Sequence, residues 1–407
     1  MRTFPADSIS SAAKKQTVVH LSQPPNPIRA QANSHPERVV VLSQKRLFNS
    51  INECIAPRSC FDPPMKLVAF TLFAVASVSS LPAADANTAH RPPGSRTLPA
   101  MPPATSPVMF DTPEADRIVA ALQIFPPDNP WNTDISKWPV HPNSQNIVAS
   151  IGAEKPLRYN PDMGYVIVPP AQAKVAVKIT GYPDESDRTP FPVPDNLPIE
   201  GWPASFRRSA KHAKLTLDDV QRDTRKQGGD RHATIVDPIN GMLYELYQAR
   251  KTDDGWSAAQ TSIFDLKSNK LRPEGWTSTD AAGLPLFPAI VRHDELQRGE
   301  IEHALRVTVR RSRRAYVAPA THFASRLTDT NLPRMGERLR LKADFDITRF
   351  SPPVQTILKA LKKYGMLVAD NGIEWAISVA PDERIPVLND ELRRIQGAAF
   401  EVVEKPR

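Results

Sequence analysis

The sequence predicts a mainly β fold, an antiparallel sandwich or barrel-like core with a few peripheral helices, and α+β is the alternative class. Three observations support this prediction. Short runs rich in Val, Ile, Tyr and Thr recur along the chain, clusters of Pro, Gly, Asn and Asp separate them, and few segments have helical periodicity.

Seven runs are predicted to be strands, and several alternate polar with apolar residues, as half-buried strands do. They are residues 165–168, 174–180, 233–236, 242–247, 304–309, 339–342 and 375–379. The segment 237–241 ends in Asn-Gly, which supplies the positive φ angles of a tight hairpin turn, so the runs on either side of it are expected to pair. Residues 370–372 are expected to turn before the last run.

The best helix candidate is Pro353–Tyr364, which carries apolar residues at helical spacing on one face. Ser351 is a suitable N-cap residue, and lysines near the C-terminal end complement the helix dipole. Gly365 follows as a residue that can end the helix. The other helices are expected to be few and peripheral.

A secretory signal peptide is predicted at residues 65–86. Met65 and Lys66 begin it, an apolar run of about a dozen residues follows, and small residues offer cleavage sites. The apolar run is shorter than the roughly 20 residues that a membrane-spanning helix needs. Residues 1–64 lack regular periodicity and are predicted to be an over-extended gene model or a disordered extension. The predicted location is therefore secreted or periplasmic, with no transmembrane span.

A proline-rich linker is predicted at residues 87–115. Six prolines lie among the 17 residues 91–107, which excludes helix and central strand there. The chain after the linker has no internal repeat and no second segment of this composition. Residues 116–407 are therefore predicted to form a single secreted β-rich domain.

Charge and cysteine content narrow the function classes. Both cysteines, Cys54 and Cys60, precede Met65, so the exported chain would contain no disulfide, thiolate metal site or cysteine nucleophile. From residue 87 onward the chain has 43 basic and 39 acidic residues, a balance that does not indicate nucleic-acid binding. The dense basic run Arg306–Arg314 is expected to be the solvated face and turn of a hairpin, and the alternative is a patch for an anionic polymer.

Standard sequence motifs for nucleotide binding, zinc proteases and serine hydrolases are absent from the sequence. Histidines and carboxylates at strand ends and in loops are the catalytic candidates: His232, Glu245, Asp280, His303 and His322. Each histidine taken alone is more typical of a structural hydrogen bond. As a set, these residues suit general acid–base chemistry or an oxygen–nitrogen metal site. Their spacing specifies neither a metal nor a cofactor.

Two of these candidates lie on the predicted hairpin. Pairing across residues 240–241 would place Val236 opposite Glu245. His232 would then share the face of Glu245, four residues further along. The two side chains are expected to bracket a ligand without touching each other.

Four further residues are predicted to bind substrate: Arg306, Trp276, Tyr247 and Asn371. Arg306 would neutralise the carboxylate of an acidic sugar in a lyase reaction. All six tryptophans follow the signal peptide, mostly at turns. They are expected to fill the core or cover hairpin ends, and the alternative is a stacking platform for sugar rings.

Six segments between residues 122 and 385 form a distinctive set: Phe125–Ser136, Asp230–His232, Leu271–Pro285, Ile301–Arg306, Pro319–His322 and Ala369–Gly372. As a set, they resemble a family of secreted bacterial proteins of uncharacterised function. The resemblance implies a single exported domain. It brings no assigned reaction and no catalytic residue.

Three function classes remain. The leading hypothesis is a secreted or periplasmic carbohydrate-active enzyme, a glycosidase or polysaccharide lyase, in which Glu245 and Asp280 supply a pair of carboxyl groups. The alternatives are a non-catalytic envelope or polysaccharide-binding protein and a metal-dependent hydrolase. The predicted partner is a polysaccharide or another small-molecule ligand, and the oligomeric state is not predicted. Convergence of the candidates in one pocket would favour the enzyme.

Overall fold

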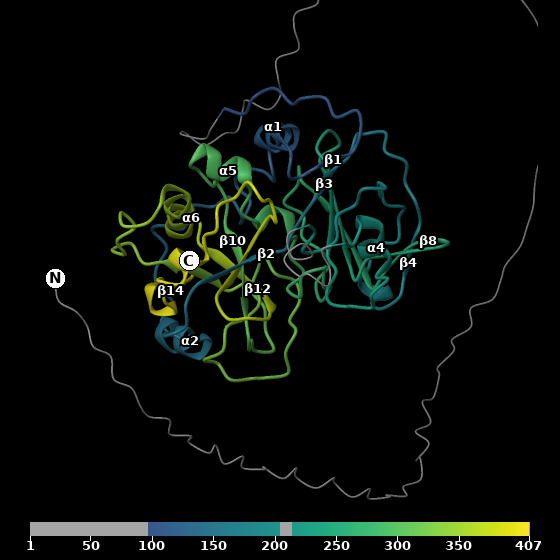
Figure 1. Ribbon diagram of the computed structural model, residues 1–407. Helices are drawn as coiled ribbons and strands as arrows, with labels where there is room; N and C mark the ends of the chain where they lie inside the picture. The colour runs from purple at the N-terminus through teal and green to yellow at the C-terminus, as the bar shows by residue number, and fades with distance from the viewer. Residues whose placement is uncertain (1–96, 204–213, 407) are drawn as a thin grey trace, which may run out of the picture. The chain divides into compact units, whose positions relative to one another are not determined.

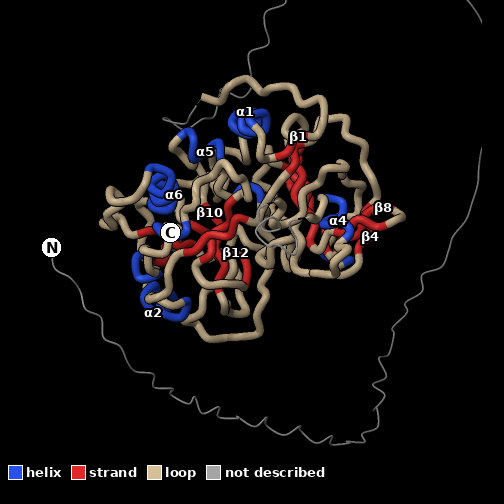
Figure 2. Tube along the Cα trace, in the orientation of Figure 1, coloured by secondary structure: helices blue, strands red, loops and turns tan. Residues whose placement is uncertain are grey.

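Three sheets organise the residues that the computed structural model describes, 97–203 and 214–406 (Figure 1). The strands are β1 (Val108–Met109), β2 (Arg158–Pro161), β3 (Val166–Ile167), β4 (Val177–Ile179), β5 (Ala233–Asp237), β6 (Met242–Tyr247), β7 (Arg250–Thr252), β8 (Gly255–Ala258), β9 (Gln260–Asp265), β10 (Leu305–Val309), β11 (Arg338–Leu341), β12 (Met366–Asn371), β13 (Ala376–Val379) and β14 (Phe400–Val403). The helices are α1 (Pro113–Ala121), α2 (Ser144–Ile151), α4 (Leu217–Arg222), α5 (His293–Arg298), α6 (Pro352–Lys363) and α7 (Asn389–Leu392), with short 3-10 helices η1 (Pro183–Glu185), η2 (Phe287–Ala289) and η3 (Gly397–Ala399). Loops connect these short elements over much of the domain (Figure 2).

The strand orders are β1-β3-β5-β6-β9 in the first sheet, β14-β11-β12-β10-β13-β2 in the second and β4-β8-β7 in the third. This arrangement confirms the mainly β class with few helices. The described sheets are open and mixed, however, because β10–β12, β13–β2, β3–β5 and β4–β8 pair in parallel. Between β10 and β12 the chain forms β11 and α6, a connection long enough to return in the same direction. Most strand pairs are antiparallel, as predicted. The sequence did not predict the parallel pairs, because residue alternation carries no information about strand direction.

The predicted hairpin forms with a longer turn. Strands β5 and β6 pair antiparallel across residues 238–241, so Glu245 lies opposite Thr234 and not opposite Val236. The register therefore differs by two residues from the predicted one. Because side chains alternate with a period of two, this shift leaves each side chain on its predicted face. His232 and Glu245 share a face as expected.

Helix α6 confirms the predicted helix, and its apolar face is buried against the core. The helix contacts α5 and β11. Ser351 occupies the N-cap position without a side-chain capping bond. Gly365 has a φ of 66°, the left-handed conformation that glycine adopts readily at a helix end.

The structure corrects the boundary between linker and domain. Residues 1–96, which include the predicted extension and signal peptide, lie outside the described residues. Residues 97–107 form no helix or strand, but β1 and α1 begin within the predicted linker. Strand β1 pairs with β3, and Phe110 is buried in the core. The proline run ends at Pro107, and the apolar residues directly after it join the sheet.

The first sheet is buried on both faces, which positions the candidate site. One face of β5 and β6 contributes Ile235 and Leu246 to a small core. The other face contributes Val236 to the main core, which the second sheet also lines. Because side chains alternate along a strand, His232 and Glu245 face the main core. None of the helices within the described ranges is long and apolar enough to cross a membrane.

Candidate functional site

A histidine–glutamate pair, with the histidine buried and the glutamate partly exposed, lies at the start of β5. His232 Nδ1 lies 3.0 Å from a carboxylate oxygen of Glu200, and His232 Nε2 lies 2.8 Å from the carbonyl oxygen of Thr279. Burial alone would lower the pKa of His232, but the charge and hydrogen bond of Glu200 outweigh burial and raise it to about 9. The same pairing holds the pKa of Glu200 below its ordinary value despite burial. Near neutral pH the pair is ionised.

Asp162, directly after β2, lies beside this pair. Its carbonyl oxygen accepts a 2.7 Å hydrogen bond from the N–H of Gly201, the neighbour of Glu200. Its Oδ1 atom is buried and has no hydrogen-bond partner among the described residues. Burial, together with the negative charge of Glu200, raises the pKa of Asp162 to about 8. The positive charges of Arg306 and His232 oppose this shift without reversing it. At neutral pH Asp162 is therefore mostly protonated.

A two-pronged ion pair joins Asp280 to Arg306 in β10. Arg306 Nε and Nη2 donate to the two carboxylate oxygens of Asp280 at 2.8 and 2.6 Å, and Arg306 Nη1 donates to Ser378 Oγ at 2.7 Å. Both charged side chains are buried. All three guanidinium nitrogens thus donate to protein groups. These contacts do not support the predicted role of Arg306 in binding a substrate carboxylate.

Asp370, near the end of β12, completes this group. Ala282 N–H donates to the carbonyl oxygen of Ala369 at 2.9 Å, which holds the loop that carries Asp280 against the strand. Burial and then the charge of Asp280 raise the pKa of Asp370 to about 7. We call six residues the central carboxyl cluster: Asp162, Glu200, His232, Asp280, Arg306 and Asp370. It holds four carboxyl groups and only two cations.

Glu245 is bound by the protein itself, so its contacts do not support the predicted place in a catalytic pair. Its carboxylate accepts hydrogen bonds from the N–H groups of Leu286 and Phe287 at 2.9 and 3.0 Å. The hydroxyl of Thr279 donates a third, at 3.0 Å. Burial raises the pKa of Glu245 to about 7, and these bonds limit the shift. Thr279 therefore stands between His232 and Glu245, where the sequence predicted a ligand.

His303 belongs to a second group, at helix α5. Its Nε2 lies 2.7 Å from Glu295 Oε1, which also accepts a 2.6 Å bond from Arg292 Nη2. We call five residues the α5 cluster: Arg292, Asp294, Glu295, Arg298 and His303. The hydrogen bonds of His303 go to this cluster and to the adjacent backbone, and none joins it to another predicted catalytic residue.

His322 and Tyr247 lie next to the central carboxyl cluster. His322 Nδ1 is 2.8 Å from the carbonyl oxygen of Ala281, the neighbour of Asp280. The ring of Tyr247 packs on that of His232, with centroids 5.5 Å apart. Both side chains are partly exposed. They border the cluster and make no hydrogen bond to its carboxyl groups in the described structure.

Asn371 and Trp276 have protein partners of their own. Asn371 Nδ2 donates to the carbonyl oxygen of Ala324 at 2.9 Å. The guanidinium of Arg272 lies 5.4 Å from the ring centre of Trp276. Three tryptophans are buried, Trp131, Trp256 and Trp375, and three are partly exposed, Trp138, Trp202 and Trp276. Half of the tryptophans thus serve the core, as expected.

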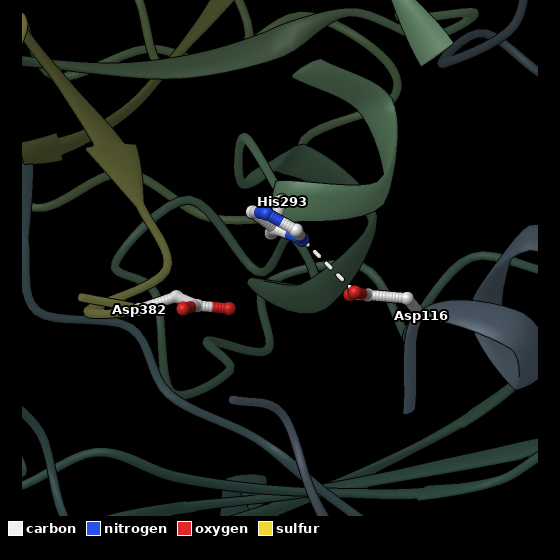
Figure 3. A group of neighbouring side chains, drawn as sticks. All are labelled: Asp116, His293 and Asp382. Atoms are coloured by element: carbon white, nitrogen blue, oxygen red, sulfur yellow. Dashed lines mark hydrogen bonds and ion pairs between the residues drawn. The ribbon is translucent and has the colours of Figure 1, made fainter. Parts of the chain in front are cut away.

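Another histidine–carboxylate group lies where α1, α5 and the chain after β13 meet. Asp116, His293 and Asp382 each offer a ligand atom, and these atoms lie within 4.8 Å of one another (Figure 3). Arg384 already joins both carboxylates, with Nη1 2.7 Å from Asp116 and Nε 2.9 Å from Asp382. A bound guanidinium supplies the positive charge that a metal would bring. The contacts therefore favour an ion-pair network over a metal site.

A small pocket that is partly open to solvent lies apart from these groups. Its lining includes Phe125, Trp131, Phe264 and Arg272, and none of the central carboxyl cluster lines it. Its titratable lining residues are Lys270 and Arg272, and it contains no histidine or carboxylate for acid–base chemistry. The central carboxyl cluster is therefore the better candidate for a catalytic site.

The sequence did not single out Asp162, Glu200 or Asp370 as a catalytic residue. Each is a single acidic residue next to proline, glycine or asparagine, a context in which acidic residues are common. The unusual feature of these groups is that they come from positions far apart in the chain and are all partly buried near Arg306 and His232. A turn composed of Asn-Pro-Asp before an apolar strand was the available signal for Asp162, and it is a weak one.

Comparisons of the chain with protein-family models, curated proteins and solved structures gave no match. The resemblance to a secreted bacterial family therefore stays a prediction. Function has to be inferred from the burial, contacts and charge of the central carboxyl cluster.

Proposed function

We propose that the domain is a secreted or periplasmic carbohydrate-active enzyme that hydrolyses glycosidic bonds, with Asp162 as general acid and Asp370 as the second carboxyl group. The observation that carries this proposal is the pair of raised pKa values, about 8 for Asp162 and about 7 for Asp370, in one partly buried cluster. Glycoside hydrolysis needs one protonated carboxyl group and one ionised one. Near pH 7 these two residues can fill the two roles.

The chemistry follows from the protonation states. Asp162 donates its proton to the glycosidic oxygen as the bond to the anomeric carbon breaks, so the leaving sugar departs as an alcohol. Asp370, ionised, removes a proton from the water that attacks the anomeric carbon. Positive charge develops on the sugar ring in the transition state, and the ionised carboxylate of Asp370 is the group of the pair that can stabilise it. Substrate entry would proceed past the partly exposed Asp162 and Asp370.

The contacts favour hydrolysis over the lyase reaction. A lyase needs a cation free to neutralise the carboxylate next to the abstracted proton. Arg306 is the cation of the cluster that the sequence suggested, and Asp280 and Ser378 occupy it. His232 is engaged on both ring nitrogens and carries a proton at neutral pH, so it is poorly suited to act as the base.

The test uses variants that remove one carboxyl group at a time. Asp162→Asn should lower turnover of natural glycosides by about 10²–10⁴-fold, the usual contribution of a general acid. Aryl glycosides with good leaving groups should lose far less, because their departure needs little protonation. Asp370→Asn should impair both kinds of substrate. Glu401→Gln, which removes a carboxylate paired with Arg340, is the control and should keep full activity.

Neutral and acidic polysaccharides should be assayed for new reducing ends and for unsaturated sugars. Reducing ends without unsaturation support the proposal. Unsaturated products would show a lyase. Binding without any cleavage would show the non-catalytic alternative, and equal activity of Asp162→Asn and wild type would remove Asp162 from the mechanism.

A further inference from the structure

The loop between β10 and β11 carries arginines that have no acidic partner. Residues 311–328 contain four arginines and no Asp or Glu. Arg310, just before them, pairs with Glu374 at 2.6 Å. Arg311, Arg314 and Arg326 are exposed, and none forms an ion pair with any residue that the structure describes. Because no acidic residue lies among residues 311–328, this stretch of the loop is a local excess of positive charge.

Aromatic rings lie among these arginines. The ring planes of Tyr316 and His322 lie within 18° and 1° of that of Phe323, with centroids 6.3 and 5.7 Å away. The guanidinium of Arg314 lies 5.6 Å from the centre of the Phe323 ring. Such a contact uses the flat face of the guanidinium, whose N–H donors point outward in its plane. These donors remain suited to a carboxylate.

The loop is tied to the central carboxyl cluster at two points. His322 contacts the carbonyl oxygen of Ala281, next to Asp280. Asn371, next to Asp370, donates to the carbonyl oxygen of Ala324 and accepts a bond from Ser312. Ser312 near the start of the loop, and His322 and Ala324 in its middle, therefore lie beside residues of the cluster. The N–H of Arg314 also bonds to the carbonyl oxygen of Leu327 at 2.6 Å, which brings Arg326 near Arg314.

We infer that Arg311, Arg314 and Arg326, with the rings of Tyr316, His322 and Phe323, bind acidic sugar residues of the polysaccharide that the central carboxyl cluster cleaves. The inference deepens the proposed function, and rests on it for the link to cleavage. Guanidinium groups bind carboxylates in a two-pronged geometry, and aromatic rings pack against the apolar faces of sugars. A uronic acid polymer offers both groups at every residue.

Only part of the basic run Arg306–Arg314 belongs to this binding surface. Arg306 is buried in the cluster and Arg310 is paired, so neither belongs to the binding surface. The sequence left open a patch for an anionic polymer in this run, and we place that patch in the loop that follows β10. A nucleic acid also carries negative charge and stacking faces, so it is the competing ligand that the test has to exclude.

The experiment measures binding of oligogalacturonate by calorimetry, with a neutral oligosaccharide of equal length and a single-stranded oligonucleotide as comparisons. Asp162→Asn serves as the parent, so that turnover does not disturb the measurement. Arg311→Gln with Arg314→Gln should weaken oligogalacturonate binding by about tenfold or more, the loss expected for charge-assisted bonds. Binding by the parent should also weaken as salt is added.

Arg349→Gln is the matched control, because Arg349 is likewise exposed and lies over two rings, Phe345 and Phe350. It should bind as the parent does. Equal binding of the neutral oligosaccharide, tighter binding of the oligonucleotide, or unchanged binding by the double variant would each overturn the inference. Selective binding that depends on Arg314, in a protein that cleaves no polysaccharide, would support this surface while contradicting the proposed hydrolysis.

Discussion

The central carboxyl cluster and the α5 cluster both surround a buried histidine, yet their charge balance differs. The central carboxyl cluster has four carboxyl groups and two cations, His232 and Arg306. The α5 cluster has two carboxylates, two arginines and His303. In the first, carboxyl groups outnumber cations, whereas in the second each carboxylate has a cationic partner within hydrogen-bond distance.

This difference appears in the pKa values. Burial raises the pKa of Asp162 to about 8, because the nearby cations are too few to offset it. Burial also opposes ionisation of Glu295, but Arg292 and His303 outweigh it and lower the pKa to about 2. A carboxyl group that still exchanges its proton near neutral pH suits acid–base catalysis, and one fixed in its ionised form suits structure. His232 and His303 were equivalent candidates in the sequence, and the charge balance around them now distinguishes a candidate catalytic group from a structural one.

The largest expected effect is on stability, from removing one carboxyl group from each cluster. Glu295→Ala should lower the free energy of unfolding by about 3–5 kcal/mol, because it leaves Arg292 and His303 buried without their acceptor. Asp162→Asn should be neutral or stabilising at pH 8, since the amide has no charge to bury. Chemical denaturation of both variants measures this. Equal losses of stability in the two variants would contradict the view that only the α5 cluster stabilises the fold.

A smaller effect is expected for His303→Ala. The sequence predicted a catalytic role for His303, which would make turnover the property that this change abolishes. From the structure we expect the reverse, a loss of about 2 kcal/mol in stability from the missing hydrogen bond and the cavity, with activity retained. Turnover per folded molecule, normalised by circular dichroism, checks it, and His232→Gln is the paired variant that should lose turnover. Activity lost in both variants would place His303 in the catalytic group.

The two clusters should respond to pH in opposite directions. Asp162 and Asp370 have raised pKa values in the folded state, so the folded protein binds more protons and stability falls as pH rises from about 4 to about 8. His232 adds to this fall, since its stabilising charge is present below pH 6.5 and lost as pH rises through about 9. Glu295, with its pKa lowered to about 2, stabilises above pH 4.5 and less as pH falls toward 2.

Thermal unfolding across this range should therefore show a maximum near mildly acidic pH. Asp162→Asn should flatten the decline on the alkaline side by a few degrees and leave the acid side unchanged. A decline of equal slope in Asp162→Asn would mean that other groups carry the pH dependence.

The sequence predicted local features well because they depend on neighbouring residues. Alternation located β5 and β6, and helical spacing together with Gly365 located α6. Parallel pairing and the strands β9 and β12 were missed, because direction and burial are set by distant segments. The central carboxyl cluster was not predicted for the same reason. Asp162 and Asp370 are more than two hundred positions apart, and β2 and β12 belong to one sheet only through β13 and β10, which lie between them. Glu245 and His303 are residue types that suit acid–base catalysis, but in the fold their hydrogen bonds go to structural partners and not to one another.

The smallest effect is expected at Arg384, whose guanidinium completes a balanced group like the α5 cluster. Zinc should leave the thermal midpoint of the wild-type domain unchanged, because a metal would have to displace Arg384 from Asp116 and Asp382. Arg384→Ala leaves these carboxylates and His293 within 4.8 Å of one another, without the cation. Zinc should then raise the midpoint of the variant, by an amount that grows with zinc concentration as ligand linkage requires. The double variant Arg384→Ala with His293→Ala should lose this response. A zinc-dependent shift in the wild type would instead show that a bound arginine does not exclude a metal from Asp116, His293 and Asp382. Charge balance would then not distinguish a structural cluster from a binding site.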